Sequence, residues 1–253
     1  MLSKETVNLF EKLQMPYPAV AVKFSFSKPA DTKKSEEVLS FCQFLKLAQY
    51  SGEKFFISAG NDNCFGKIAL GMEPKPPFEA GGQAGYDFGV FRTPAANARL
   101  HNTYPTLVAK SVNYVTFCPV SCCDFDPDLL ICVAELNQAD ILMRATSYIS
   151  GDLWESKTSC VMSCAWTYVY PYLSGKVNFC ITGMHHGMKR RKVYPPGLHI
   201  ISIPYQKLLE VTAALGEMDW ELIAMREDAE SKRLLNQKME AWKEMAPEAV
   251  IQE

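Results

Sequence analysis

Residues 129–134 read Leu129-Leu130-Ile131-Cys132-Val133-Ala134, and an amphipathic segment follows almost at once over residues 138–149. A near-continuous apolar run of this length is typical of a central strand that is covered on both faces. Residues 19–26 predict a second strand, because small, β-branched and aromatic residues there alternate with Lys23 and Ser25 towards the end. Together the two runs predict an α/β fold, with α+β as the alternative, in which helices flank a mixed sheet.

Shorter runs on either side complete the predicted sheet and its helices. Strands are expected over residues 55–58, 111–120, 177–181 and 198–204. Helices are expected before Pro16 and over residues 41–50, 64–70 and 208–215. The glycine-rich segment 79–89 lacks the spacing of a dinucleotide or phosphate loop, so it predicts a turn-rich connection or the wall of a ligand pocket.

Two segments of the chain share one order of elements, which suggests an internal repeat. Residues 19–72 and residues 128–173 each run strand, helix, Ser-Gly-acid and, a dozen residues later, a cysteine that opens a helix. Those cysteines are Cys64 and Cys164. The pattern predicts a single α/β domain over residues 1–215, made of two pseudo-repeated halves, with chance resemblance as the alternative. Residues 216–253 predict a C-terminal helical extension.

The composition disfavours several classes of function. The 253 residues are 48% hydrophobic and 21% charged, with a net charge of -2, which gives no reason to expect nucleic acid or an anionic membrane as a partner. No run approaches the roughly 20 apolar residues of a membrane helix, and the N-terminus lacks an apolar signal core. We therefore expect a cytoplasmic protein. Hydrolase motifs such as Gly-x-Ser-x-Gly and His-Glu-x-x-His are absent from the sequence.

Nine cysteines in such a chain indicate metal ligation, redox chemistry or an anaerobic host rather than disulfides. Cys118 and Cys132 lie in predicted strands and are expected in the core. Cys160 and Cys164 are four residues apart, which on a helix would place both thiols on one face. No Cys-x-x-Cys is present, so the common zinc, redox and ferredoxin patterns are unmatched. Two hypotheses therefore remain open: four dispersed cysteines bind one cluster, or the chain binds no metal.

Other features carry candidate chemistry of their own. Cys64 follows a predicted turn at residues 61–63 and would open a helix, whose N-terminus lowers a thiol pKa, so a thiol nucleophile is one hypothesis. The pair His185-His186 is expected in an exposed loop, with metal ligation or anion binding as the alternative. The basic run at residues 189–192 predicts a solubilising turn or a docking patch for an anionic group. The vicinal pair Cys122-Cys123 stays unassigned.

Several short motifs, fairly specific as a set, are similar to those of one family. The chain resembles the family called domain of unknown function 169, found in many anaerobic archaea and bacteria, over roughly residues 5–215. Phe65 departs from the pattern, which usually has proline after the second cysteine. The resemblance implies shared cysteines at Cys42, Cys64, Cys164 and Cys180 and leaves the other five without counterparts. The matching segments are residues 18–24, 40–43, 64–66, 70–71, 124–128, 163–165 and 171–175.

These four thiols lead to the main functional hypothesis. A [4Fe-4S] cluster on Cys42, Cys64, Cys164 and Cys180 would serve electron transfer or reductive chemistry on a small molecule. If the protein is an enzyme, it is then an iron-sulfur-dependent oxidoreductase. The alternative is a small-molecule-binding protein with no redox cofactor, whose cysteines lie in the core or bind zinc. Expected partners are a small-molecule ligand or a redox partner protein, and a second copy of the chain through the C-terminal helices.

Overall fold

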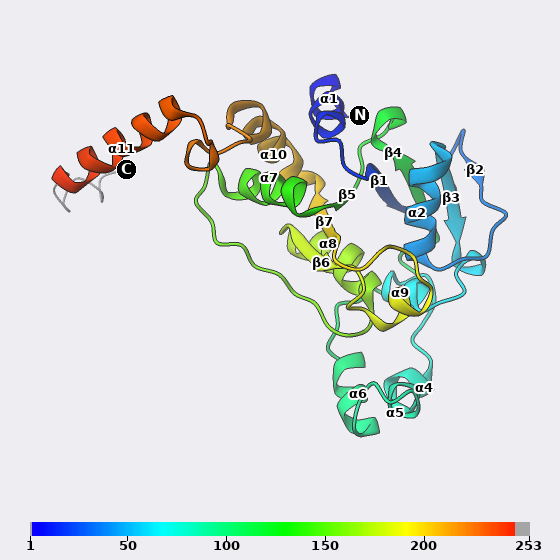
Figure 1. Cartoon of the computed structure of the whole chain (residues 1–253). Helices are drawn as coiled ribbons and strands as arrows, with labels where there is room; N and C mark the ends of the chain where they lie inside the picture. Colours follow the sequence, from blue (N-terminus) through cyan, green and yellow to red (C-terminus); the bar gives the residue numbers. More distant parts are fainter. Residues whose placement is uncertain (1, 246–253) are drawn as a thin grey trace. The chain divides into compact units, whose positions relative to one another are not determined.

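A seven-stranded mixed sheet is built from strands between residues 17 and 204 (Figure 1). The computed structural model describes residues 2–245. Its strands are β1 (Tyr17–Ser25), β2 (Lys33–Lys34), β3 (Phe55–Ser58), β4 (Tyr114–Pro119), β5 (Leu129–Ala134), β6 (Asn178–Ile181) and β7 (His199–Pro204). They lie in the order β2-β3-β4-β1-β5-β7-β6. The pair β2 and β3 is parallel and the other neighbouring pairs are antiparallel, which confirms the predicted mixed sheet with flanking helices.

The helices of the chain differ widely in length. Four are longer than ten residues: α2 (Phe41–Ser51), α7 (Leu136–Ser147), α10 (Tyr205–Glu217) and α11 (Ala229–Glu244). The others are α1 (Lys4–Lys12), α3 (Gly66–Ala69), α4 (Pro77–Ala80), α5 (Gln83–Asp87), α6 (Pro94–His101), α8 (Tyr170–Ser174) and α9 (His186–Arg190). Single turns of 3₁₀-helix lie at η1 (Ala59–Asn61), η2 (Val120–Cys122) and η4 (Ile223–Met225), and η3 (Ala165–Val169) is a π-helix.

The apolar run at residues 129–134 is β5, and all six of its residues are buried. It pairs with β1, where Val20 lies opposite Ile131, and with β7 on its other side. One face of the sheet carries Val20, Ile131 and their neighbours into a core cluster shared with α2 and η3. Helix α7 contacts β5 and β7, and its buried residues lie outside that cluster. Both faces of β5 are therefore covered, as its unbroken apolar sequence predicted.

The structure corrects two expectations about local geometry. The glycine-rich segment at residues 79–89 is more than the turn-rich connection that was one expectation, because it contains the end of α4 and the whole of α5. Residues 148–162 form neither helix nor strand, so Cys160 and Cys164 do not share a helix face. The second of the two proposed repeats therefore has no counterpart of β3, although β1 and β5 do lie side by side in the sheet.

The chain divides into two compact units, Met1–Gly216 and Glu217–Glu253. The first unit holds the sheet and the cysteines. The second contains η4 and α11, and the side chain of Asp228 caps α11 by accepting a hydrogen bond from the Ser231 amide at 2.8 Å. The last part of the predicted C-terminal extension, residues 246–253, lies outside the described residues. Within residues 2–245, no helix has both the length and the apolar character needed to cross a membrane.

Candidate functional site

A cavity of about 670 Å³ in the first unit brings three of the predicted site cysteines together. Cys42 reaches it from the first turn of α2, Cys64 from the turn before α3, and Cys164 from the segment that leads into η3. The helices α4, α5 and α6 form another wall, and α9 contributes residues to a further one. Cys180, the fourth predicted residue, is not part of the lining.

Phe41 fixes the three cysteine segments relative to one another. Its backbone carbonyl accepts a hydrogen bond from the Tyr168 hydroxyl at 3.3 Å, and the two rings meet edge to face at 5.7 Å, which ties α2 to η3. A Cβ placed on Gly66 would lie 2.3 Å from the Phe41 ring, so the turn that carries Cys64 packs directly on the same side chain. Since Phe41 is fully buried, these contacts hold the cavity wall in one geometry.

A local irregularity in the backbone presents Cys164. Pro171 has no N–H to donate to a carbonyl one turn earlier, and the preceding residues Ala165–Val169 take the wider π-helical turn. Cys164 stands directly before this turn and is buried, with Ser163 beside it. π-Helical turns are frequent at functional sites, and this one shapes the wall on which Cys164 lies.

The thiols of Cys42 and Cys164 form a hydrogen-bonded pair. The hydrogen bond from Cys164 lowers the pKa of Cys42, and Ser163 contributes in the same direction with its hydroxyl oxygen 3.3 Å from the Cys42 sulfur. The same Cys164–Cys42 hydrogen bond, together with burial, raises the pKa of Cys164 well above its usual range. Hydrogen bonding within the pair therefore favours the ionised form of Cys42 and the protonated form of Cys164.

Cys64 has a different environment from the one that its sequence predicted. Burial raises the pKa of the Cys64 thiol, and this effect outweighs the lowering by the positive charge of Arg191. The expected lowering by a helix N-terminus is wrong as a net effect, because α3 is only four residues long and the thiol is largely removed from water. Asp62 takes up the local amide donors instead, accepting from the backbone N–H of Cys64 at 3.2 Å and of Lys67 at 2.8 Å.

Cys180 lies in β6 opposite Ile200 and is buried. Burial raises its pKa to about 11, and the charge of Cys42 acts in the same direction, so the two sulfurs are electrostatic neighbours. The amide of Asn178 points at the Cys180 sulfur from 3.9 Å. Cys180 therefore stands behind the cavity wall rather than on it.

The model of domain of unknown function 169 (DUF169), described as uncharacterised ArCR, matches residues 8–214. The chain belongs to the DUF169 family. It is similar to the uncharacterized protein MJ0308 of Methanocaldococcus jannaschii, with 23% identity over 212 residues that cover 82% of this chain and 90% of that protein. No solved structure matches it.

The DUF169 fold adds residues to the site that the sequence did not single out. Glu79, Asn97 and His101 line the cavity from α4 and α6, and all three are buried. Arg190 and Arg191 line it from the end of α9, so the basic run belongs in part to the cavity rather than to a solubilising turn. In the sequence, only the glycine-rich segment and the basic run pointed to this part of the cavity. Each could also be explained as an ordinary surface turn.

The histidine pair divides between core and surface. His186 is exposed and stacks on Phe88 at 6.1 Å between ring centroids, and it lines the cavity. His185 is only 1% exposed, so its expected place in an exposed loop is wrong. Its Nε2 lies 2.9 Å from the Thr158 hydroxyl, and burial lowers its pKa to about 4. His185 is consequently a neutral, structural imidazole at ordinary pH.

The remaining cysteines do not line the cavity. Cys118 and Cys132 are fully buried in β4 and β5, as expected for core residues. The sulfur of Cys118 lies 3.6 Å from that of the exposed Cys122, and hydrogen bonding to Cys123 contributes most to raising the pKa of Cys118. Cys160 is exposed. None of these thiols lines the cavity that holds Cys42.

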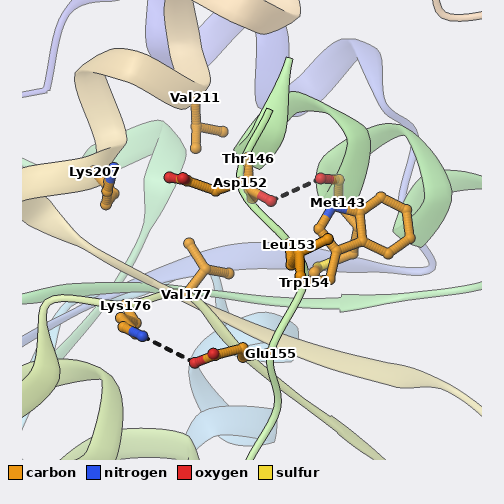
Figure 2. A pocket seen from close by; sticks show the side chains of 10 residues that line it. All are labelled: Met143, Thr146, Asp152, Leu153, Trp154, Glu155, Lys176, Val177, Lys207 and Val211. Atoms are coloured by element: carbon orange, nitrogen blue, oxygen red, sulfur yellow. Dashed lines mark hydrogen bonds and ion pairs between the residues drawn. The ribbon is translucent and has the colours of Figure 1, made fainter. Parts of the chain in front are cut away.

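A second hollow of about 430 Å³ lies between the irregular segment after α7, the segment before β6 and α10 (Figure 2). Three of its charged side chains are paired: Lys176 Nζ lies 2.9 Å from Glu155, and Lys207 Nζ lies 2.8 Å from Glu210, which is not part of the lining. No cysteine or histidine is among the ten residues that line it. The hollow therefore offers no thiol or imidazole, and the cysteine cavity is the better candidate for thiol or iron-sulfur chemistry.

The donor set of the cysteine cavity fits a thiophilic group. Thiolates are the preferred ligands of iron-sulfur clusters, and three cysteines on one wall match that chemistry. Among residues 2–245, no three Cys, His, Asp or Glu side chains are already arranged around a single metal-ion position. Binding would require the thiols to lose protons and turn towards a common centre.

Proposed function

We propose that this DUF169 protein binds a [4Fe-4S] cluster through Cys42, Cys64 and Cys164 and uses it for electron transfer or for reductive chemistry on a small molecule. Cys180 is the candidate for the fourth ligand. The observation that carries the proposal is the convergence of three thiols, from segments about 20 to 120 residues apart in sequence, on one wall of a cavity of about 670 Å³.

The charges around the cavity support an anionic group on this wall. The positive charge of Arg191 acts on Cys42, Cys64 and Asp62, and in each case it favours the ionised form. Its guanidinium also donates to the Asn63 carbonyl at 3.3 Å, which holds it beside the Cys64 turn. A cluster bound by thiolates carries net negative charge, and a neighbouring guanidinium offsets the cost of placing that charge in a partly buried site.

The residues of the site would have different roles in binding the cluster. Hydrogen bonds with Cys164 and Ser163 lower the pKa of the Cys42 thiol and so favour the thiolate that a cluster needs. Cys64 is the ligand nearest to solvent, since its side chain is only partly buried whereas Cys42 and Cys164 are buried. The cluster, when bound, supplies single electrons. The cavity beside the thiols supplies room for a small molecule.

One observation favours the alternative of a small-molecule-binding protein without a redox cofactor. The Cys42 and Cys164 thiols satisfy each other by a hydrogen bond, and Phe41 holds their helices together without any metal. In this case the cysteines line a binding pocket or bind zinc. Elemental analysis separates the proposals, because iron with equimolar sulfide supports the cluster, whereas zinc or no metal in a folded sample supports the alternative.

The test of the proposal is the visible and electron paramagnetic resonance spectrum of protein prepared without oxygen. We expect broad visible absorbance that bleaches on reduction and a paramagnetic signal in the reduced state. Cys42→Ser, Cys64→Ser and Cys164→Ser should each weaken or abolish both features. Cys160→Ser is the matched control, because Cys160 is exposed and outside the cavity, and it should leave them unchanged. Colourless protein after reconstitution with iron and sulfide would contradict the cluster.

Cys180→Ser separates two versions of the cluster site. Loss of the spectrum in this variant assigns the fourth ligand to Cys180. A spectrum and a paramagnetic signal that both persist unchanged assign only three protein ligands and leave one iron facing the cavity. Because Cys180 is buried in β6, the far-ultraviolet circular dichroism of the variant must match that of the parent protein before either result is read.

A further inference from the structure

Three thiols that do not line the cavity meet where β4 ends. Cys118 lies in β4, Cys122 ends the single turn η2, and Cys123 follows it. Because η2 turns the chain back on itself, the Cys122 sulfur lies 3.6 Å from the Cys118 sulfur. Cys118 is also hydrogen-bonded to Cys123. The vicinal pair that the sequence left unassigned therefore belongs to a thiol triad of Cys118, Cys122 and Cys123.

The members of the thiol triad differ in their access to solvent. Cys122 is exposed, whereas Cys118 is fully buried and Cys123 is buried. A dissolved reagent therefore meets Cys122 first. The Cys122 sulfur also lies 3.5 Å from the Pro119 carbonyl oxygen and 3.8 Å from the Gly52 carbonyl oxygen. The thiol that solvent can reach is thus held in contact with a buried thiol.

The geometry selects one pair of the triad for a disulfide bond. The sulfurs of Cys118 and Cys122 would have to approach by about 1.5 Å to reach the S–S bond length of about 2.05 Å, and the exposed Cys122 side chain has room to move. A bond between Cys122 and Cys123 is disfavoured, because adjacent Cα atoms are about 3.8 Å apart and disulfides usually need at least about 4.4 Å. The Cys123 sulfur lies 3.3 Å from the Phe125 carbonyl oxygen instead.

The charges around the triad suit a reaction that starts at the exposed thiol. Lys54 Nζ lies 2.6 Å from the Asp124 carboxylate, and this hydrogen bond raises the pKa of Lys54, with smaller contributions in the same direction from Cys118 and Cys122. The ammonium is therefore an electrostatic neighbour of both sulfurs, and a nearby cation favours the thiolate that reacts with disulfides. Hydrogen bonding to Cys123 raises the pKa of Cys118, so this buried thiol is suited to complete an exchange rather than to begin one.

We propose that Cys122 and Cys118 form a thiol–disulfide exchange site that reacts with low-molecular-weight disulfides. The Cys122 thiolate, after losing its proton to water, attacks one sulfur of the small disulfide; a mixed disulfide forms, the S–S bond of the small molecule breaks, and its other half leaves as a thiolate that takes up a proton. The Cys118 sulfur then attacks the Cys122 sulfur, and the second small thiolate leaves with the proton from Cys118. Two electrons pass from the protein sulfurs to the small disulfide, which is released as two thiols.

The test treats the whole chain, prepared without oxygen, with bis(2-hydroxyethyl) disulfide, and mass spectrometry then reads the state of each cysteine at its own position. A neighbouring thiol has an effective concentration of about 1 mM or more, so with the released thiol held at about 0.1 mM the Cys118–Cys122 disulfide should exceed the mixed disulfide on Cys122 by at least about tenfold. Cys160 is the internal control, because it is exposed and is not part of the triad, and it should hold the mixed disulfide. A mixed disulfide that persists on Cys122 while Cys118 stays a free thiol would overturn the proposal.

Three variants assign the steps to these residues. Cys118→Ser should leave the mixed disulfide on Cys122 as the final product, because the second thiol is missing. Cys122→Ser changes an exposed position, so it tests the same site if Cys118→Ser fails to fold, and it should leave Cys118 and Cys123 as free thiols. Cys123→Ser is the matched control and should still form the Cys118–Cys122 disulfide. A Cys118–Cys123 disulfide in Cys122→Ser, or loss of the disulfide in Cys123→Ser, would refute the assignment.

The exchange site goes beyond the proposed cluster and does not depend on it, because none of the three thiols lines the cavity. If the protein holds iron and sulfide but Cys118 stays free, the exchange site is wrong and the proposed cluster stands. If the Cys118–Cys122 disulfide forms with the expected dependence on both thiols and no iron is found under any preparation, the exchange site stands and the cluster is wrong.

Discussion

The buried histidine gives the sharpest quantitative prediction for stability. His185 is 1% exposed, and its pKa falls from the ordinary 6.5 to about 4 because burial disfavours the charged ring. The unfolded chain therefore takes up a proton before the folded chain does. Stability from the neutral imidazole is fully present above about pH 6.5 and is lost as the pH falls towards 4. Each unit of pKa difference is worth about 1.4 kcal/mol, so the loss is about 3 kcal/mol.

The assay compares the free energy of unfolding of the parent chain and of His185→Gln at pH 7 and pH 4, by urea denaturation under reducing conditions. The introduced glutamine side chain does not titrate, and other ionisable groups cancel in the difference between the two proteins. The free energy of unfolding of the parent minus that of His185→Gln should fall by about 3 kcal/mol from pH 7 to pH 4. His186→Gln, in the same segment but exposed, controls for the loss of an imidazole. An advantage that is the same at both pH values would refute the reasoning.

Two further predictions concern the core and the cysteine cavity. Ile131→Ala should lower the free energy of unfolding by about 2–5 kcal/mol, because the side chain is fully buried in β5. Its control is Leu153→Ala, at a 90% exposed position, which should change the free energy of unfolding by less than about 0.5 kcal/mol in the same urea assay. Gly66→Ala would press a Cβ into the buried Phe41 ring. It should therefore lower the midpoint of urea unfolding and alter the rate at which Cys64, in the adjacent turn, is alkylated. Gly60→Ala, whose Cβ would have no atom within 4 Å, should do neither.

The fold could be predicted largely from the sequence because its signals are local. The apolar run of β5 and the alternating pattern of β1 fix where the strands lie, and Ser51-Gly52 marks the end of α2, where Gly52 takes the left-handed cap conformation. The family resemblance, confirmed over residues 8–214, selected the cysteines that the structure then distributes between the cavity and the strand behind it. Local pattern could not reveal that distribution, because it depends on contacts such as that of Phe41 with Tyr168, more than 120 residues apart.

The rest of the site was hidden for physical reasons. Burial of Glu79 and Asn97 follows from the packing of three short helices, and helices of four or five residues have too few turns to show a periodic apolar face. The position of Cys64 before a helix suggested an acidic thiol, but desolvation outweighs the field of a four-residue helix. Which of two adjacent histidines enters the core is likewise set by tertiary contacts, here the hydrogen bond of His185 with Thr158.

The proposed cluster requires Cys42, Cys64 and Cys164 to act together as its ligands. Iron and acid-labile sulfide per chain, measured on protein prepared without oxygen, test it most directly when Cys64→Ser is compared with Cys122→Ser. Both thiols are at least partly accessible, but only Cys64 lines the cavity. The account predicts about four iron and four sulfide per chain in the parent and in Cys122→Ser, and a marked loss of both in Cys64→Ser. Equal iron in the two variants, or none in the parent after reconstitution, would contradict it.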